Sequence, residues 1–487
     1  MVALALGALG AWAWPAEGPA PGVTSTDGPA NGAEAPGLPA PAAPAPPEAP
    51  ASVEVEGGDE LGARPETPSA STRPRNPVFD IAANVTLGGI LKAPAGDEAW
   101  RRRAREWLQM YPWHSERLKI ARWLHEGGEP LSVVALPGGQ THEDAGSPRG
   151  AVFLGGSQRA LCFDAHAPVV RVVDASTGVP QGTLELGLSP SALVASPDGD
   201  QLLVAGWAAR GVEWLTLDVA DDAVALVSSL RTSLPSPPDA PWLDDLGRAE
   251  RVTAMAYDPP RRRLAVAVSG RQQVFLYRVD WATRELVWER ERDGVSARVH
   301  ELAVSSQGHL GAAYFNGGDG VRRPIARVES ADGERRWEHH AHELFSAYFV
   351  SFRDDGGQLA LGTKSGELLW LKEIALDAEP VALGQPVADP RGLKPSTRAH
   401  PSWTTGGAFS TDGAWLYSAA GDYMTAGASG ELAVWDLRAG APTEPARRIS
   451  RPAAFRSLVR STDGERLLLF RADCHVEVWD ARALRAE

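Results

Sequence analysis

The histidines of residues 337–345, WEHHAHELF, come closer to a metal-ligand pattern than any other cluster in this chain. Successive side chains of a strand point to opposite faces, so only His340 and His342 would share a side. Two imidazoles without a third histidine or a matched carboxylate make a poor metal site. The chain also lacks a Gly-x-Ser-x-Gly elbow, a phosphate-binding Gly-rich strand–helix motif and a Cys-x-x-Cys-His haem attachment. We therefore predict a non-catalytic protein with no catalytic, metal-binding or cofactor-binding residues.

Side chains suited to binding another protein gather in four long connections, residues 232–250, 316–323, 385–404 and 421–430. Trp, Tyr and Arg are the residue types that most often anchor protein interfaces. The predicted partner-binding surface consists of Trp242, Asp244, Asp245, Arg391, Lys394, Arg398, His400, Trp403 and Tyr423. The alternative is that these connections are only proline-stiffened surface loops that cover one end of the fold.

The elements that must position these connections form a repeat that occurs seven times. Each unit contains an apolar run, a tight polar turn, a second apolar run and a third run that ends near an acidic residue. The turns fall at residues 155–157, 196–199, 258–260, 305–308, 353–356, 410–413 and 461–464. Asp-Gly sequences promote such turns because the Asp side chain bonds the backbone and Gly accepts a positive φ. Units of this length cannot bury their apolar faces alone, so the repeat predicts copies stacked on one another.

The third runs carry a family signal, because two of them end in Trp-Asp: Trp435-Asp436 and Trp479-Asp480. Over residues 129–487 the chain resembles a divergent member of the WD-repeat class of seven-bladed β-propellers. This resemblance implies an all-β fold and a role as a protein-interaction scaffold or recognition module. The Gly-His pairs of the family are absent, and its buried Asp-His-Ser-Trp network has only Asp473 and Trp479, in the last unit, as candidates. The alternative is a propeller enzyme that uses the central channel, either a lactonase-like hydrolase or a quinoprotein-like oxidoreductase.

The ring needs one more strand, because only ARALRAE follows the last repeat. Residues 131–137, LSVVALP, form a strand-like run before the first unit. We predict that this run completes the last blade and closes the ring, which would remove exposed sheet edges. In a propeller, the connections between blades and those between second and third strands emerge on one face. The four long connections would therefore share that face.

Residues 77–128 are predicted to form a short helical extension. Trp100, Ala104, Trp107 and Leu108 share one face at helical spacing, and Pro112 divides the segment into two short helices. One interpretation is an amphipathic anchor at a membrane surface. The other is a helical pair docked on the propeller, which the glutamates interspersed among the arginines favour.

The N-terminal region predicts a tether. Residues 2–14, VALALGALGAWAW, resemble the apolar part of a secretory signal but lack its basic flank, so a cleaved signal, an anchor and a truncated start all stay open. Residues 15–76 are rich in Pro, Ala and Gly and are predicted to be a disordered linker. We therefore expect an extracytoplasmic protein, periplasmic or membrane-anchored, with a cytoplasmic location as the alternative.

Charge and cysteine content narrow the classes of partner. A formal net charge of −14 argues against nucleic acid, because phosphate binding needs a basic surface. The chain has 2 cysteines, Cys162 and Cys474, and whether they pair is left open. We expect a monomeric propeller with a protein partner, no cofactor and a possible membrane tether through the N-terminus.

Overall fold

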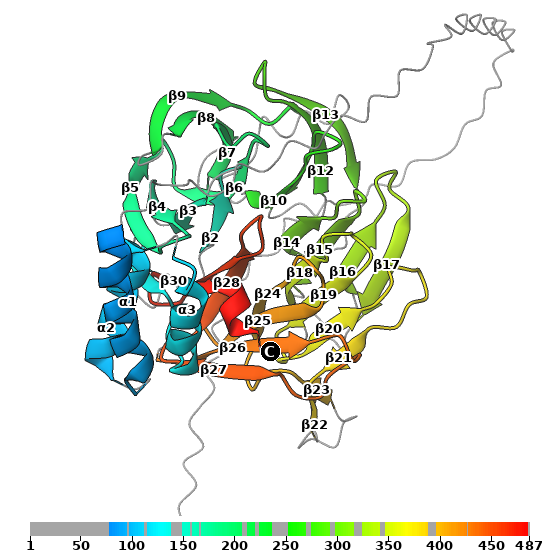
Figure 1. Ribbon diagram of the computed structural model, residues 1–487. Coiled ribbons are helices and arrows are strands. Elements are labelled where there is room, and N and C mark those ends of the chain that lie inside the picture. Colours follow the sequence, from blue (N-terminus) through cyan, green and yellow to red (C-terminus); the bar gives the residue numbers. More distant parts are fainter. Residues whose placement is uncertain are drawn as a thin grey trace, which may run out of the picture. The chain divides into compact units, whose positions relative to one another are not determined.

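Seven four-stranded antiparallel sheets stand round a common centre as the blades of a propeller (Figure 1). The computed structural model describes residues 77–94, 97–111, 114–137, 149–155, 158–164, 167–206, 212–219, 224–235, 252–268, 274–292, 298–315, 324–340, 346–387, 396–425 and 427–485. The predicted signal-like segment 2–14 and linker 15–76 lie outside these ranges. The all-β, seven-bladed fold class predicted from the repeat is confirmed.

Each blade is built from an inner, a second, a third and an outer strand. The inner strands are β2 (Arg149–Phe153), β6 (Pro190–Ala195), β10 (Val252–Asp258), β14 (Arg298–Val304), β18 (Ala347–Phe352), β24 (Thr404–Phe409) and β28 (Phe455–Arg460). The second strands are β3 (Arg159–Asp164), β7 (Gln201–Gly206), β11 (Arg263–Val268), β15 (Leu310–Phe315), β19 (Leu359–Thr363), β25 (Trp415–Gly421) and β29 (Arg466–Arg471). We number the blades one to seven in this order.

The third and outer strands complete the blades. The third strands are β4 (Val169–Asp174), β8 (Val212–Val219), β12 (Val274–Asp280), β16 (Pro324–Glu329), β20 (Leu368–Leu371), β26 (Gly430–Asp436) and β30 (His475–Asp480). The outer strands are β5 (Val179–Glu185), β9 (Val224–Thr232), β13 (Glu285–Arg292), β17 (Arg335–His340), β21 (Val381–Leu383), β27 (Arg447–Arg451) and β1 (Ser132–Ala135). A separate two-stranded sheet, β22 (Gln385–Val387) and β23 (Ser396–Arg398), lies in the connection between blades five and six.

The outer strand of blade seven comes from the N-terminal side of the propeller. β1 pairs antiparallel with β30, from Ser132 opposite Val478 to Ala135 opposite His475. The pairing falls at the run 131–137 in which the sequence places the closing strand. Strands that precede blade one and follow blade six therefore meet in one sheet.

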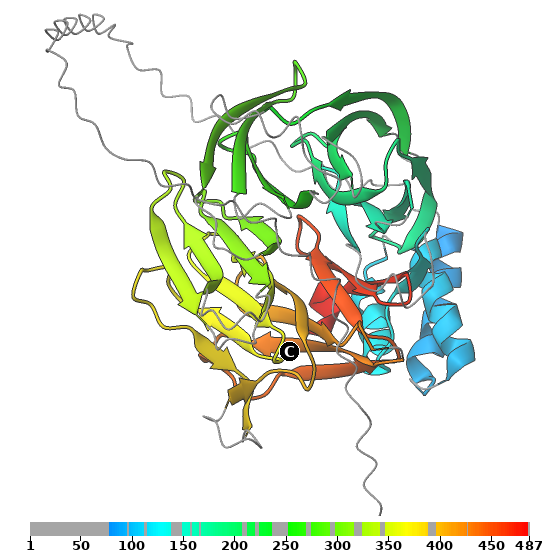
Figure 2. The same ribbon diagram turned by 180° about the vertical axis from the view of Figure 1, so that it is seen from behind.

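Helices α1 (Pro77–Lys92), α2 (Glu98–Met110) and α3 (Arg117–Glu126) lie beside blades one and seven (Figures 1 and 2). Asp97 caps α2 by accepting the Ala99 N–H at 2.9 Å, and the Trp107 indole donates to the Ala83 carbonyl at 2.9 Å. Trp107 and its apolar neighbours on α2 belong to the same buried cluster as side chains of β1, β3 and β29. The apolar face of α2 is thus buried within the fold, as the docked interpretation requires. None of the helices in the described ranges combines the length and apolarity needed to cross a bilayer.

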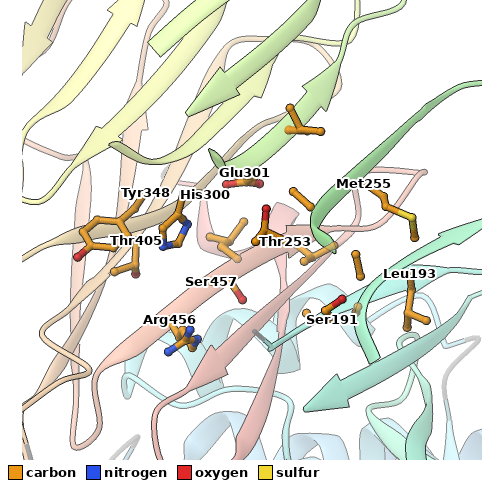
Figure 3. Close-up of a pocket in the computed structure, with 18 of the residues that line it drawn as sticks. Ser191, Leu193, Thr253, Met255, His300, Glu301, Tyr348, Thr405, Arg456 and Ser457 are labelled. Carbon is orange, nitrogen blue, oxygen red and sulfur yellow. The ribbon is translucent and has the colours of Figure 1, made fainter. Parts of the chain in front are cut away.

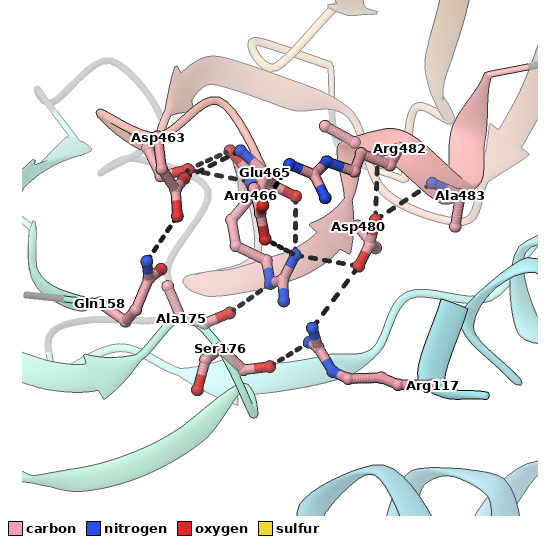
Figure 4. A network of polar contacts seen from close by, with 12 residues as sticks. Arg117, Gln158, Ala175, Ser176, Asp463, Glu465, Arg466, Asp480, Arg482 and Ala483 are labelled. Carbon is pink, nitrogen blue, oxygen red and sulfur yellow. Dashed lines mark hydrogen bonds and ion pairs between the residues drawn. The ribbon is translucent and has the colours of Figure 1, made fainter. Parts of the chain in front are cut away.

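A charged network joins α3 to blades one and seven (Figure 4). Arg466 is buried and donates to the Ala175 carbonyl at 3.0 Å and to the Asp480 carboxylate at 2.9 Å. Arg117 of α3 donates to the Ser176 carbonyl at 2.5 Å and lies 3.9 Å from Asp480. Asp480 also caps the short C-terminal helix α4 (Ala481–Leu484). This network holds the last blade, the first blade and the helical extension together.

A buried hydrogen-bonded chain of the Asp-His-Ser-Trp kind lies in blade six. The Trp435 indole donates to Ser418 Oγ at 2.8 Å, and Ser418 Oγ lies 2.7 Å from His400 Nε2. His400 Nδ1 lies 2.5 Å from the Glu431 carboxylate, so the acid of this chain is a glutamate. A neutral imidazole satisfies both bonds when Nδ1–H donates to Glu431 and Nε2 accepts from Ser418.

Blade seven does not contain this arrangement. The Trp479 indole donates to the buried carboxylate of Glu477 at 3.1 Å, and Glu477 also accepts from Arg451 at 3.0 Å. Asp473 instead accepts from Arg471 at 2.9 Å. The sequence-based choice of Asp473 and Trp479 for the network is therefore wrong, because each side chain has an arginine or a glutamate as its partner.

The two cysteines do not form a disulfide, although both side chains are buried. The Cys474 thiol lies 3.6 Å from the Asp164 carboxylate. Burial raises the pKa of Cys162 well above its usual range, which keeps its thiol protonated and unreactive.

His125 joins α3 to blade seven as a neutral imidazole. Its Nδ1 lies 2.7 Å from the Glu129 carbonyl, while the Asp480 N–H donates to Nε2 at 3.2 Å. The ring also packs 4.9 Å from the Trp479 ring. Because one nitrogen must donate and the other accept, only the neutral form fits. Burial accordingly lowers the pKa of His125 to about 4.

This buried histidine predicts a loss of stability in mild acid. Between about pH 6.5 and pH 4 the unfolded chain binds a proton at His125 that the folded chain does not, so stability falls as the pH falls through this window. From pH 7 to pH 4.5 the wild type should lose about 2–3 kcal/mol more than His125→Gln, as measured by urea unfolding. Identical pH dependence in wild type and His125→Gln would contradict the prediction.

Candidate functional site

A cavity of about 250 Å³ lies at the centre of the ring and is lined by residues of all seven inner strands (Figure 3). A second cavity, of about 450 Å³, is lined by residues of β14, β18, β24 and β28 and by the turns that follow β14 and β18. The two share Glu301, Leu458 and Val459. Together they mark the central channel, with Glu301 at the point where the cavities meet.

Six of the seven inner strands contain a one-residue bulge at corresponding positions, as their registers against the second strands show. The bulged residues, which we call the bulge ring, are Ser191, Thr253, His300, Tyr348, Thr405 and Arg456. Every one of them lines the first cavity. In blade one the pairing of β2 with β3 is regular. A bulge turns its side chain out of the normal alternation, and here that directs one residue per blade toward the channel.

Half of the bulge ring carries hydroxyl side chains that bond the backbone. Ser191 and Thr253 donate to the carbonyls of Ala205 and Ala267 at 3.2 and 3.4 Å, and Thr405 Oγ1 lies 3.3 Å from the Ala419 carbonyl and 2.9 Å from the Phe455 carbonyl of blade seven. The three alanines lie on the second strands beside the bulges, where the extra residue interrupts the regular pairing. The hydroxyl replaces the backbone donor that the bulge displaces, which satisfies a buried carbonyl.

The other half carries large side chains, which gather with rings from blade six. Tyr348 stacks on Trp403 with centroids 5.5 Å apart, and Tyr423 meets both rings edge-on at 5.9 and 5.3 Å. The His300 ring is perpendicular to Tyr348 at 4.9 Å. Trp403 precedes β24, and Tyr423 follows β25. A connection between blades and a connection within a blade thus meet at one end of the channel.

Two cations lie over these rings. The Arg456 guanidinium is 4.5 Å from the Tyr423 ring centre, and the Lys364 ammonium is 5.0 Å from that of Trp403. We call the six residues His300, Tyr348, Lys364, Trp403, Tyr423 and Arg456 the mouth cluster. Desolvation raises the pKa of Tyr348 well above its usual range, so its phenol stays neutral. The two tyrosines are buried at the base of the cluster, while the other four side chains are partly exposed.

Glu301 is the carboxylic acid among the residues that line the first cavity. It follows the bulged His300 on β14 and is partly exposed to the channel. Desolvation raises its pKa to about 8, although a hydrogen bond from the Val350 N–H acts in the opposite direction. At neutral pH this side chain is therefore largely protonated and adds little negative charge to the cavity.

The predicted partner-binding residues do not form one group in the part of the chain that the structure describes. Trp242, Asp244, Asp245, Arg391 and Lys394 lie outside the described residues. Trp403 and Tyr423 come together in the mouth cluster, with ring centroids 5.3 Å apart. Arg398 ends β23 opposite Gln385 and is not part of that cluster. His400 is only 1% exposed, and its bonds to Ser418 and Glu431 hold it inside blade six. The prediction that His400 belongs to a binding surface is therefore corrected.

His300, Tyr348, Lys364 and Arg456 were not predicted from the sequence. Three of them, His300, Tyr348 and Arg456, lie at the bulges of inner strands. The length of a connection does not predict residues on inner strands. A usable signal does exist in the repeat itself: aligned on their turns, the inner strands carry unlike, often polar residues at the bulge among small and apolar neighbours.

Within the ranges that the structure covers, no group of three or more His, Cys, Asp and Glu side chains could hold a metal ion. His339 stacks on Trp337 at 5.7 Å, and His340 lies 3.2 Å from the Glu338 carboxylate. His342 falls outside the described residues. The described histidines of this segment thus have partners within their own strand.

Comparison with known proteins identifies a fold neighbour and no family. No family model matches the chain, and no curated protein matches its sequence. A solved structure of hydrazine synthase from Kuenenia stuttgartiensis is similar at 16% identity and a TM-score of 0.49. The match covers 66% of this chain and 92% of that chain. The seven-bladed assignment rests on the strand pairing of the chain itself.

Proposed function

We propose that this protein is a non-catalytic propeller of the WD-repeat kind that binds a protein partner at the channel mouth of blades four to seven. One observation carries the proposal: three aromatic rings, an imidazole and two cations from four blades converge at one end of the channel. Clustered aromatic and arginine side chains are the usual anchors of protein interfaces. The apolar segment 2–14 and the linker 15–76 support presentation outside the cytoplasm on a tether.

The alternative of a propeller enzyme is favoured by His300 and Glu301, which both line the cavity. These two groups are consecutive on one strand, and catalysis would also need a nucleophile or a second acid–base group. The hydroxyls of Ser191, Thr253 and Thr405 are bonded to backbone carbonyls. The recognition function therefore accounts for more of the described side chains.

Site-specific photo-crosslinking tests the proposed function. A photoreactive phenylalanine analogue at Trp403, in the full chain in its native host, should yield a discrete crosslinked protein. The matched control is the same analogue at Leu376, which is 69% exposed and lies between β20 and β21. Tyr423→Ala should reduce the crosslink at 403 about tenfold, because its ring supports Trp403. A product at 376 of equal yield, or none at 403, would argue against a partner at the mouth.

A further inference from the structure

Two cations of the mouth cluster lie over two rings that are in contact with each other. Tyr423 and Trp403 meet edge-on, and each carries one cation over its face, Arg456 and Lys364 respectively. A guanidinium over a ring keeps its N–H donors in its own plane, so stacking is compatible with binding a carboxylate or phosphate side-on. Two positive charges thus flank one pair of rings at the channel entrance.

The acids Asp422 and Glu301 lie near this entrance. Among the described residues, Lys364 forms no ion pair. The Asp422 carboxylate is turned to its own loop, where it accepts from the Met424 N–H at 3.1 Å and from the Thr425 hydroxyl at 2.6 Å. Below the cluster, Glu301 is largely protonated at neutral pH. The mouth cluster thus places two cations beside the Asp422 carboxylate, on a chain whose formal net charge is −14.

We propose that the mouth cluster binds an anionic group of the partner, a carboxylate or a phosphate, between Arg456 and Lys364. This inference rests on the proposed function and names the chemistry of the ligand. The cavity below has a volume of about 250 Å³ and adjoins the second cavity of about 450 Å³. It has room for one extended side chain or chain end.

Capped pentapeptides that differ only at the central residue test the ligand chemistry. The full chain is titrated by calorimetry with peptides carrying Glu, phosphoserine, Gln or Lys at the centre, and with a Gln peptide that ends in a free carboxylate. At least one anionic peptide should bind about tenfold tighter than the capped Gln peptide, and the Lys peptide should bind more weakly. The affinity of the anionic peptide should fall as salt is added. Comparing the three anionic peptides distinguishes an acidic side chain, a phosphorylated side chain and a chain terminus as the source.

Charge-only variants locate the site. Arg456→Gln and Lys364→Gln should each weaken the anionic peptide about tenfold. The chain offers matched controls, because Arg438 lies 4.8 Å over Trp415 and Lys372 lies 5.0 Å over Trp370, both outside the mouth cluster. Arg438→Gln and Lys372→Gln should leave the affinity unchanged.

Three results would overturn the anion site: equal binding of the Glu and Gln peptides, loss of binding in the control variants to the same extent, or no charge-dependent binding by any peptide at millimolar concentration. A crosslink at position 403 that persists in Arg456→Gln and Lys364→Gln would leave the proposed function standing without the anion site. Charge-dependent peptide binding without any crosslink at 403 would support the anion site and argue against the proposed function.

Discussion

Removal of residues 129–138 should abolish the cooperative unfolding transition of this protein. The deletion takes away β1, which pairs along its length with β30 and closes blade seven. Val134 and Leu136 of this segment are buried in the cluster that also holds Trp107 of α2. Without them the chain would expose a strand edge and an apolar face at once. Urea unfolding followed by tryptophan fluorescence should then show a broad change in place of a single transition.

Adjacent residues of β1 provide a matched test that keeps the chain length. Val134 is 5% exposed, whereas its neighbour Val133 is 42% exposed. Val134→Asp should cost about 3 kcal/mol or more, because it buries a charge without a partner. Val133→Asn, which adds no charge opposite Glu477, should change stability by no more than about 0.5 kcal/mol. If the deletion variant unfolds as sharply as the wild type, closure by β1 does not stabilise the ring.

Asp480→Ala is expected to be the most damaging single substitution of a charged residue in the seam between blades one and seven. It leaves Arg466, whose side chain is 2% exposed, without its carboxylate partner at 2.9 Å. It also removes the cap of α4, where Asp480 accepts the N–H groups of Arg482 and Ala483 at 3.1 Å. Loss of one partner of a buried ion pair typically costs about 3–5 kcal/mol. Urea unfolding at pH 7 measures the loss.

The other Trp-Asp pair of the chain, Trp435-Asp436, provides the control. Asp436 occupies the same place in blade six, but its side chain is 32% exposed and pairs with Arg438 at the surface. Asp436→Ala should therefore change the free energy of unfolding only slightly, because solvent screens an exposed pair. Equal losses for both substitutions would mean that the motif, and not its burial in the seam, determines the effect.

The blades could be predicted from the sequence because their turns are local. In the turn at 461–464, Gly464 has a φ of +71°, and Gly413 in the matching turn of blade six has a φ of +66°. Such turns need only neighbouring residues, so Asp-Gly marks them directly. The closing strand could be predicted for a different reason, since the apolar pattern of 131–137 had no other blade to join.

The mouth cluster could not be predicted to the same extent. A bulge depends on how two strands pair, and its residue type is free, as Ser191 and Arg456 at corresponding positions show. The blade-six network was missed because His400 follows Ala399 and not Gly, and because Glu431 replaces the expected acid. Trp403 and Tyr423 could be assigned to one end of the ring from the sequence, because both lie in long connections expected on the same face.

The bulge ring has a consequence for how the binding properties of this fold can change. Each bulge keeps the same register whether it carries a hydroxyl, a phenol or a guanidinium. The buried Tyr348 and the three hydroxyl residues also have structural contacts, whereas His300 and Arg456 are partly exposed. Combinatorial libraries confined to positions 300 and 456 should therefore yield folded variants with different ligand preferences. At these two positions, selection for binding can act with little effect on the packing of the blades.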